Sequence, residues 1–297
     1  MSLKSLKTPL RYPGGKSRAA KYLVSKMPDF KEYREPFIGG CSVAIEVCKQ
    51  YPNADIWIND LYKPLYNFYV QLRDNELELV PLIAEFKKQH EVPDKASQLF
   101  DEAKEGLESK GNDAVLRAAY FYIINKCSFS GLTMNSSFSR QASNQNFSLN
   151  GIYKLTMYSE MMQGWKITNL SYEKLLGGDA FVFMDPPYNI KDFLYGKKGN
   201  MHKGFNHNKF AKDCNESTNK WMVTYNSNEH IRKLFDGHTM QEWDLTYTMR
   251  STGSYNLDQS KRKELLITNY EQAQLPFNSS FFFIYSKPSR QLFPICL

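Results

Sequence analysis

Residues 33–60 constrain the fold of this 297-residue chain more than any other segment. A strand-sized run at 33–38 leads into Gly39-Gly40, an amphipathic stretch follows, and a second apolar run occupies 54–58. The amphipathic stretch has the i, i+3, i+4, i+7 spacing of one apolar helix face at Cys41, Ala44, Ile45 and Cys48. The segment therefore predicts a strand, a helix and a second strand, which is the repeating unit of a parallel α/β sheet.

Further strands are predicted in the later part of the chain. The run 180–184 is apolar without interruption, as in strands that are covered on both faces of a parallel sheet. Residues 221–225 form another predicted strand, and Asn228 is suited to cap the helix after it. The alternating residues 243–249 and the run 264–269 follow each other without a helix between them, which predicts an antiparallel hairpin at the edge of the sheet.

The residues from 63 to 165 have a different pattern. Three stretches have helical periodicity, which is carried by Leu65, Tyr69 and Leu72, then by Leu79, Leu82, Ile83 and Phe86, then by 114–124. The polar stretch 125–151, rich in Ser, Asn, Gly and Gln, is predicted to form a loop or hairpin. We therefore predict an α/β domain made of 1–62 and 166–297, interrupted by a helical bundle with a hairpin at 63–165.

The composition is that of a globular protein. With 42% hydrophobic and 23% charged residues, the chain can bury a sizeable core and is not mainly disordered. Its strongest apolar run, 281–285, is strand-sized, so no membrane span is expected. Five cysteines without a Cys-x-x-Cys pair argue against a disulfide or zinc framework and favour the cytoplasm. His202 and His207 are the only close histidines; we favour a solvated loop there and expect no metal.

A first candidate site is the turn at Gly39-Gly40 together with Asp60. Glycines between a strand and a helix let the backbone approach a ligand closely. Asp60 ends the second strand, where a carboxylate can accept hydrogen bonds from the ribose hydroxyls of an adenosine group. The turn lacks Gly-x-Gly-x-x-Gly, and no Gly-Lys-Ser/Thr follows, so NAD and nucleoside triphosphates are disfavoured. A tight turn beside a surface aspartate is the alternative.

A second candidate site is Asp185-Pro186-Pro187-Tyr188, directly after the buried strand 180–184. Ligands of open α/β sheets bind at the carboxyl ends of strands. The site offers acceptors, namely the Asp185 carboxylate and the fixed Pro186 carbonyl, beside an aromatic ring, which suits a planar amine with two N–H donors. Accepting both protons of an adenine amino group would make its nitrogen nucleophilic, with Tyr188 stacked on the base. The alternative is that these prolines merely end a strand.

These motifs resemble those of the Dam-type DNA adenine methyltransferases, in the same order and over almost the whole chain. The matching elements are Arg11-Tyr12-Pro13-Gly14-Gly15-Lys16, the loop 35–42, Asn59-Asp60, Asp185 to Tyr188, and 262–266 with Asn269-Tyr270. The resemblance implies a Rossmann-like, S-adenosylmethionine-dependent methyltransferase sheet with an inserted helical target-recognition domain. It implies methyl transfer to a flipped-out adenine in duplex DNA, with Asp185, Pro186 and Tyr188 as catalytic residues. The implied cofactor-binding residues are Tyr12, Lys16, Glu35, Phe37, Gly39, Asp60 and Asp185.

The chain departs from the family pattern at three positions. Cys41 replaces the second glycine of the cofactor loop, and Arg11 replaces a lysine, which leaves a positive charge for DNA. Residues 125–135 resemble the recognition hairpin, but Met134 stands where enzymes that methylate GATC carry an arginine. Because arginine is the commonest reader of guanine, GATC specificity is in doubt. Phe129 is either a wedge between base pairs or an anchor of the hairpin.

Several basic residues are candidates for contacting DNA, in line with a net charge of +7. Residues 195–210, with four lysines and three glycines, are predicted to form a basic loop that orders on DNA, or else a solvated charged loop. We expect contacts with duplex DNA from Arg11, Lys126, Phe129, Arg140, Lys197, Lys198, Arg262 and Lys263. A catalytically silent DNA-binding protein, an RNA or cytosine substrate, and a cognate restriction endonuclease are left open by the sequence.

Overall fold

The computed structural model describes residues 3–109, 111–131, 134, 136–188, 204–243 and 264–271. Within these ranges one sheet of seven strands has the order β3-β2-β1-β4-β5-β7-β6. The strands are β1 (Glu32–Glu35), β2 (Asp55–Asn59), β3 (Lys166–Thr168), β4 (Phe181–Met184), β5 (Lys220–Asn226), β6 (Thr239–Trp243) and β7 (Glu264–Thr268). The neighbours from β3 to β5 are parallel, and β7 is antiparallel to β5 and β6.

The predicted Rossmann-like sheet with an antiparallel edge is confirmed, with differences in detail. The edge strand β6 is at Thr239–Trp243, and of the predicted run 243–249 residues 244–249 lie outside the described part of the chain. The side chains of β6 are exposed or half-buried, so this edge strand has no apolar alternation from which it could be located. The three-residue strand β3 was also not predicted.

The central strand β4 is buried on both faces, as its uninterrupted apolar sequence predicted. Phe181 and Phe183 belong to one hydrophobic core, and Val182 and Met184 belong to a second core on the opposite face. The helices α1 (Ala20–Val24) and α2 (Ser42–Gln50) cover the first face. The second face is covered by α11 (His207–Glu216) and α12 (Glu229–Leu234), which Asn228 caps as predicted.

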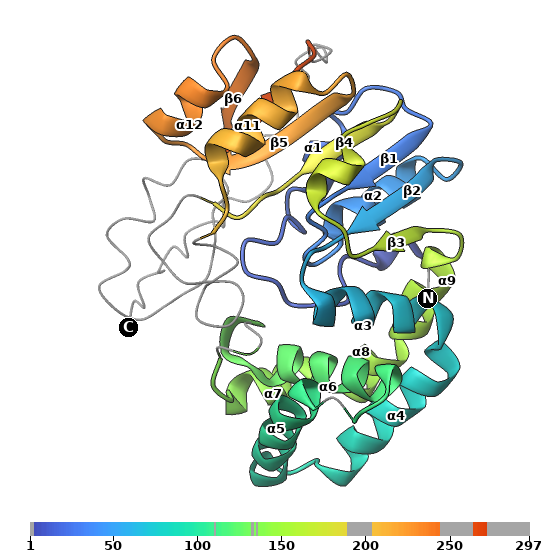
Figure 1. Cartoon of the computed structure of the whole chain (residues 1–297). Coiled ribbons are helices and arrows are strands. Elements are labelled where there is room, and N and C mark those ends of the chain that lie inside the picture. Colours follow the sequence, from blue (N-terminus) through green and yellow to red (C-terminus); the bar gives the residue numbers. More distant parts are fainter. Residues whose placement is uncertain are drawn as a thin grey trace, which may run out of the picture.

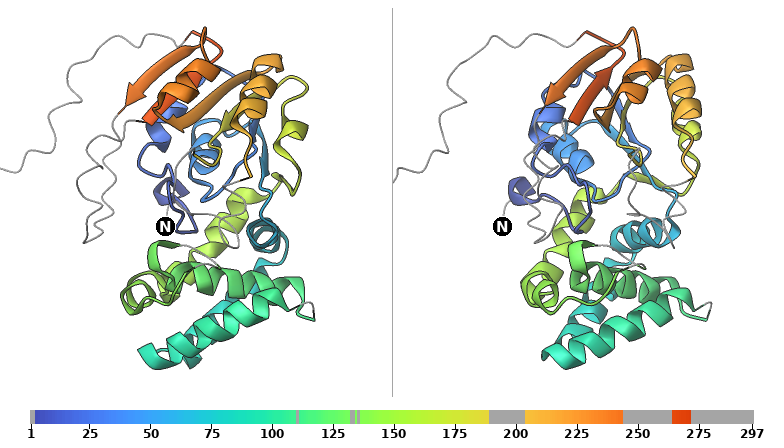
Figure 2. Two further views of the ribbon diagram at one scale, coloured as in Figure 1. Left: turned by 60° about the vertical axis from the view of Figure 1, so that its left-hand side comes forward. Right: turned by 90° about the vertical axis from the view of Figure 1, so that its left-hand side faces the viewer.

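The chain between β2 and β3 is helical. Its elements are α3 (Lys63–Asp74), α4 (Glu76–Gln89), α5 (Pro93–Glu108), α6 (Ala114–Cys127), η2 (Phe129–Gly131), α7 (Arg140–Asn146), α8 (Leu149–Tyr153) and α9 (Leu155–Met162). Figures 1 and 2 show helices α4 to α8 together at one end of the molecule, with the sheet at the other. Two short 3-10 helices, η1 (Leu3–Ser5) and η3 (Tyr172–Leu175), complete the described elements. None of the described helices is long and apolar enough to span a bilayer.

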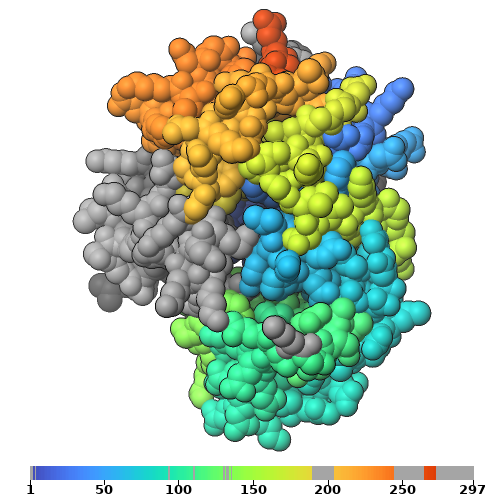
Figure 3. Space-filling model, viewed as in Figure 1, coloured from blue at the N-terminus to red at the C-terminus, as the bar shows by residue number. Residues whose placement is uncertain are grey.

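The helical segment and the sheet share one hydrophobic core. Leu65 and Phe68 of α3 and Ile123 of α6 belong to the same buried cluster as Phe181 of β4. Figure 3 shows the cyan and green surface of this segment directly beneath the surface of the sheet region. Packing against the helical segment therefore fixes the position of the sheet's first face.

Two loop predictions are wrong over part of their length. In the polar stretch 125–151, the side chains of Ser139 and Ser148 accept hydrogen bonds that cap α7 and α8, so that much of the stretch is helical. In the described part of that stretch, hairpin character is limited to one isolated bridge, between Ser128 and Phe138. The predicted basic loop 195–210 ends earlier than expected, because Asn206 caps α11 and residues from His207 onward are helical.

Candidate active site

The strand order places a crevice between β1 and β4. From β1 the chain continues to β2 on one side, whereas β4 lies on the other side, so the topology reverses at this point. Ligands of open α/β sheets bind in this crevice, outside the carboxyl ends of the strands. A cavity of about 370 Å³ lies there, and it is lined by every residue predicted to be catalytic or cofactor-binding. The glycine turn and the Asp185 motif therefore share one cavity.

The glycine turn is in close contact with the N-terminal segment. Gly39 has φ +45°, and a Cβ added there would lie 3.0 Å from the Tyr12 ring, so a side chain would displace that ring. The Tyr69 hydroxyl donates a hydrogen bond to the Gly39 carbonyl at 2.9 Å. Cys41, at the N-cap of α2, has φ +63°, a left-handed conformation that glycine adopts more easily than a residue with a Cβ.

Asp60 connects the end of β2 to the glycine turn. Its Oδ2 accepts a hydrogen bond from the Gly39 amide at 3.2 Å, and its Oδ1 accepts one from the Tyr62 amide at 2.9 Å. Burial raises the pKa of Asp60 to about 6, although these backbone amides oppose the rise. The carboxylate is half-buried at the wall of the cavity, where its remaining lone pairs can accept hydrogen bonds from a ligand.

Asp185 is the centre of a polar cluster. Lys16 Nζ lies 2.8 Å from Oδ1 and 2.7 Å from Oδ2, and the Thr224 hydroxyl donates to Oδ1 at 2.7 Å. Lys16 is buried, and its ammonium group also lies 5.0 Å from the centre of the Tyr188 ring. The sequence singled out Lys16 for the cofactor but not for an ion pair with Asp185, and it did not single out Thr224. A polar residue within the apolar strand 221–225 was the available signal.

Glu35 is a buried carboxyl group on the same wall. The Tyr33 hydroxyl donates a hydrogen bond to its Oε2 at 2.7 Å. Burial raises the pKa of Glu35 to about 8, and the negative charge of Asp185 adds to the rise, while Tyr33 and Lys16 oppose it. At neutral pH this group is therefore largely protonated and can donate as well as accept a hydrogen bond.

Aromatic rings form the wall behind Tyr188. Its ring lies 5.9 Å from that of the buried Tyr225, centroid to centroid. The Tyr225 hydroxyl is 2.7 Å from Nδ1 of His207, which is half-buried on α11 and packs against Phe205. The prediction of a solvated loop is thus wrong for His207, because it belongs to this packed wall. His202 lies outside the described residues.

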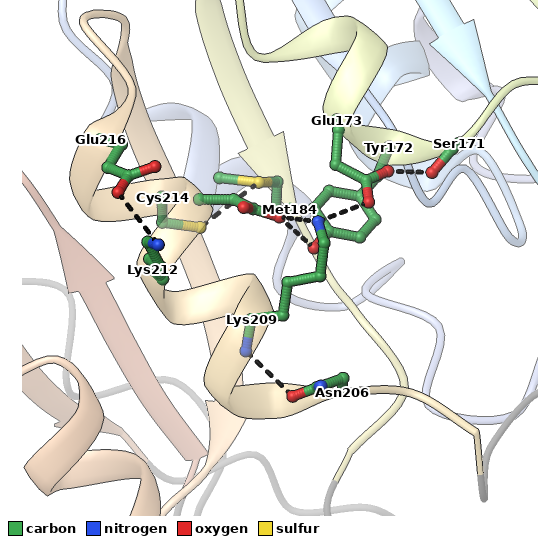
Figure 4. A network of polar contacts seen from close by, with 10 residues as sticks. Ser171, Tyr172, Glu173, Met184, Asn206, Lys209, Lys212, Cys214 and Glu216 are labelled. Carbon is green, nitrogen blue, oxygen red and sulfur yellow. Dashed lines mark hydrogen bonds and ion pairs between the residues drawn. The ribbon is translucent and has the colours of Figure 1, made fainter.

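A second polar network joins α11 to η3 beside the cavity (Figure 4). Lys209 Nζ lies 2.7 Å from Glu173 and 2.6 Å from Asp213, and the Tyr172 hydroxyl donates to Asp213 at 2.6 Å. Ser171 donates a further hydrogen bond to Glu173. These contacts hold the first turn of α11 against the segment that follows β3.

Comparison with known proteins matches residues 12–249 to the family model for D12 class N6 adenine-specific DNA methyltransferases. The chain belongs to this family. Two relatives align along most of their length. The type II methyltransferase M1.LlaDCHI of Lactococcus lactis subsp. cremoris is 25% identical over 283 residues, covering 88% of this chain and 94% of the relative. The type II methyltransferase M.MjaIII of Methanocaldococcus jannaschii is 22% identical over 292 residues, covering 88% and 98%.

As a member of this family, the methyltransferase uses S-adenosylmethionine and acts on adenine in DNA.

The residues predicted to contact DNA lie in different surroundings. The Asn125 side chain accepts a hydrogen bond from the Arg11 amide at 2.9 Å and donates one to the Arg11 carbonyl at 2.6 Å. The Arg11 guanidinium donates to the Ser128 carbonyl at 2.8 Å and is half-buried. Arg11 therefore fastens the N-terminal segment to the turn after α6, and its contact with DNA stays a prediction.

The other described candidates differ in exposure. Lys126 is half-buried above the Tyr122 ring, and burial, with a smaller contribution from Arg11, lowers its pKa to about 8. Phe129 is 59% exposed, which is at odds with its alternative role as an anchor. Arg140 is exposed in an ion pair with Asp94 at 3.1 Å.

The remaining residues from the DNA-recognition predictions give no further information on contact with DNA. Met134 is half-buried and packs against the main hydrophobic core. Four predicted DNA contacts lie outside the described residues: Lys197, Lys198, Arg262 and Lys263.

Proposed function

We propose that this methyltransferase transfers a methyl group to the exocyclic amino nitrogen of an adenine that has rotated out of duplex DNA. The observation that carries the proposal is the shared cavity of Asp185, Tyr188 and the glycine turn at the carboxyl ends of β1 and β4. An adenine within the double helix cannot present its amino group to a carboxylate in such a cavity. It must therefore leave the base stack, at a cost of a few kcal/mol.

The donors and acceptors of the cavity fit S-adenosylmethionine. The Asp60 carboxylate is suited to the ribose hydroxyls, and the turn at Gly39 lets the backbone approach the ligand. Lys16 and Glu35 line the same cavity and would face the methionine part, with Glu35 as a hydrogen-bonding group for its ammonium. When bound, the cofactor supplies a methyl group on a positively charged sulfur.

Asp185 and the Pro186 carbonyl would accept the two amino protons of the adenine, while Tyr188 stacks on the base. Withdrawing both protons into hydrogen bonds makes the nitrogen lone pair available for attack on the methyl carbon. Methyl transfer would exchange the carbon–sulfur bond for a nitrogen–carbon bond, and the nitrogen would lose one proton to the Asp185 carboxylate. Lys16 and Thr224 hold that carboxylate in place.

We further propose that the helical segment 63–165 recognises the target DNA, and that the methyltransferase acts in the cytoplasm. The exposure of Phe129 supports a role as a wedge that enters the base stack, and Arg140 is available for a phosphate. Because the two relatives are type II methyltransferases, we propose a cognate restriction endonuclease that cuts the same, still unassigned, sequence.

Transfer of labelled methyl groups from S-adenosylmethionine to mixed-sequence DNA tests the proposal. Asp185→Ala should reduce the rate of methyl transfer by about 100-fold or more. The control Asp236→Asn removes an exposed charge that is distant from Asp185 in the sequence, and its rate should equal that of the wild type. Mass spectrometry of the product should show N6-methyladenine. Methylcytosine, methylated RNA only, or equal rates for wild type and Asp185→Ala would each reject the proposal. Sequencing of the modified DNA gives the target site.

A further inference from the structure

We propose that Thr224 is a positioning residue that orients the Asp185 carboxylate, so that Oδ2 is the oxygen that accepts the adenine amino proton. Thr224 is fully buried in β5, and its hydroxyl donates to Asp185 Oδ1 at 2.7 Å. This inference rests on the proposed function, because it names the part that a further residue plays in the same site.

The sheet brings Thr224 next to Asp185. In the parallel pairing of β4 with β5, Met184 is opposite Val223. The next residue along each strand is Asp185 and Thr224, so the carboxylate leaves the end of β4 beside the threonine. Thr224 is a polar residue whose neighbours along β5, Val223 and Tyr225, are fully buried members of the hydrophobic core. A hydroxyl in such a place is costly unless it forms a hydrogen bond, and the Asp185 carboxylate provides the acceptor.

Lys16 alone does not fix the orientation of the carboxylate. Its ammonium group is at nearly equal distances from the two oxygens, 2.8 Å and 2.7 Å, so it attracts both alike. It is also carried on a flexible side chain, whereas the β-branched side chain of Thr224 is stiff at χ1 and is held in a strand. Thr224 is therefore the donor that distinguishes Oδ1 from Oδ2.

The two oxygens of Asp185 consequently differ in the number of further hydrogen bonds that they can accept. Among the described residues, Oδ1 accepts from both Lys16 and Thr224, and Oδ2 accepts from Lys16. A carboxylate oxygen accepts about two hydrogen bonds, so Oδ2 has room for an amino N–H. Because Pro186 fixes the following main chain, a carboxylate with a fixed plane and the Pro186 carbonyl form a rigid pair of acceptors. The rate of methyl transfer then depends on the orientation of this pair, whereas the affinities for S-adenosylmethionine and DNA depend on it little.

The test compares Thr224→Val, which keeps the shape and removes the hydroxyl, with Thr224→Ser, which restores it. Thr268→Val is the matched control, because Thr268 is fully buried in the adjacent strand β7 and its hydroxyl donates to the Tyr270 carbonyl instead. Single-turnover methyl transfer to DNA, calorimetric affinity for S-adenosylmethionine, and DNA affinity are measured for each. Thr224→Val should slow transfer by about 10- to 100-fold, with both affinities within about two-fold of wild type. Thr224→Ser should recover most of the rate, and Thr268→Val should match wild type.

The outcomes separate this inference from the proposed function. An active wild type with an equally fast Thr224→Val variant overturns the role of Thr224 and leaves the proposed function standing. Loss of cofactor affinity in Thr224→Val, in proportion to its loss of rate, also overturns it, because the residue would then shape the binding site generally. A wild type without adenine methylation rejects both proposals. If Thr224→Val does not fold, Thr224→Cys, with a similar volume and a weak donor, takes its place with the same expected rate loss.

Discussion

The cavity and the turn after α6 are both built on the N-terminal segment 8–16, but they use it differently. At the cavity, the segment makes its contacts through side chains. The Tyr12 ring packs on Gly39, and the Lys16 ammonium binds the Asp185 carboxylate. Such contacts can adjust, because rings and long side chains have rotamers through which they can move when a ligand arrives.

At the turn after α6, the main chain of the segment is held at Arg11. The Asn125 amide bridges the N–H and C=O groups of Arg11, and a Cβ on Gly131 would lie 2.6 Å from the Arg11 carbonyl oxygen. Backbone groups cannot rotate away, so this contact is rigid. The rigid contact therefore holds the N-terminal segment against the helical region, while the adjustable contact holds the reacting groups.

The largest expected effect is on the rigid side. Gly131→Ala should destabilise the protein by about 3 kcal/mol, because the new Cβ meets backbone at 2.6 Å and φ is +73°. Gly39→Ala should cost only about 1–2 kcal/mol, because its Cβ meets the Tyr12 ring, which can move. Urea unfolding of both variants measures the difference. Equal losses would contradict the distinction between the two contacts.

A comparable effect on stability is expected from the protonation of Glu35 in the cavity. Burial raises its pKa from an ordinary 4.5 to about 8. Between these values the folded protein holds a proton that the unfolded chain has released, so unfolding becomes easier as pH rises. Relative to Glu35→Gln, the wild type should lose about 2–4 kcal/mol of unfolding free energy from about pH 5 to pH 8.

Denaturant unfolding of both proteins at several pH values provides the measurement. The contribution of Glu35 is fully present below its ordinary value and is lost as pH rises through about 8. Asp60 has the same sign but is present in both proteins, so it cancels in the comparison. Parallel curves for wild type and Glu35→Gln would show that the carboxyl group is ionised in the folded state.

Burial and sequence pattern explain which helices and strands could be predicted from sequence. The strand β4 was found because both of its faces are buried and its sequence is apolar throughout. The edge strand β6 was not predicted, because its exposed side chains leave no apolar periodicity. Helices α7 and α8 were missed because their polar sequences are held in helical form by serine caps, and such caps are common in loops too.

The candidate site follows the same rule. Asp60 and Asp185 were identified because each belongs to a local motif at the end of a strand. Thr224 was missed because its contact with Asp185 spans 39 residues and depends on the pairing of β4 with β5. The contact of the Arg11 guanidinium with the Ser128 carbonyl was also missed, because 117 residues separate the two in the sequence. A contact between distant segments leaves at most a polar residue in an apolar strand, as at Thr224, and does not identify its partner.

A substitution in the cavity should not change the function of the other region, the turn after α6. Asp60→Ala should weaken binding of S-adenosylmethionine by about ten-fold, since it removes a charged acceptor for the ribose hydroxyls, and leave DNA affinity near wild type. The wild-type affinity should also rise as pH increases through about 6, where Asp60 ionises, and the variant should lack that rise. Calorimetry with Asp55→Ala, an exposed aspartate at the start of the same strand, as the control measures this. Weakened DNA binding in Asp60→Ala would show that the two regions are coupled.

The smallest effect on stability, and the sharpest test of the second region, is expected from Phe129→Ala. Because the ring is 59% exposed, its removal should change unfolding free energy by less than about 0.5 kcal/mol. As a wedge, however, Phe129 offsets part of the cost of unstacking a base step, so its loss should lower the methylation rate on duplex DNA several-fold. Single-stranded DNA needs no wedge, and its rate should be unchanged. A variant that loses equally on both substrates, or that is destabilised by about 2 kcal/mol or more, would assign Phe129 to packing and leave base displacement to residues outside this turn.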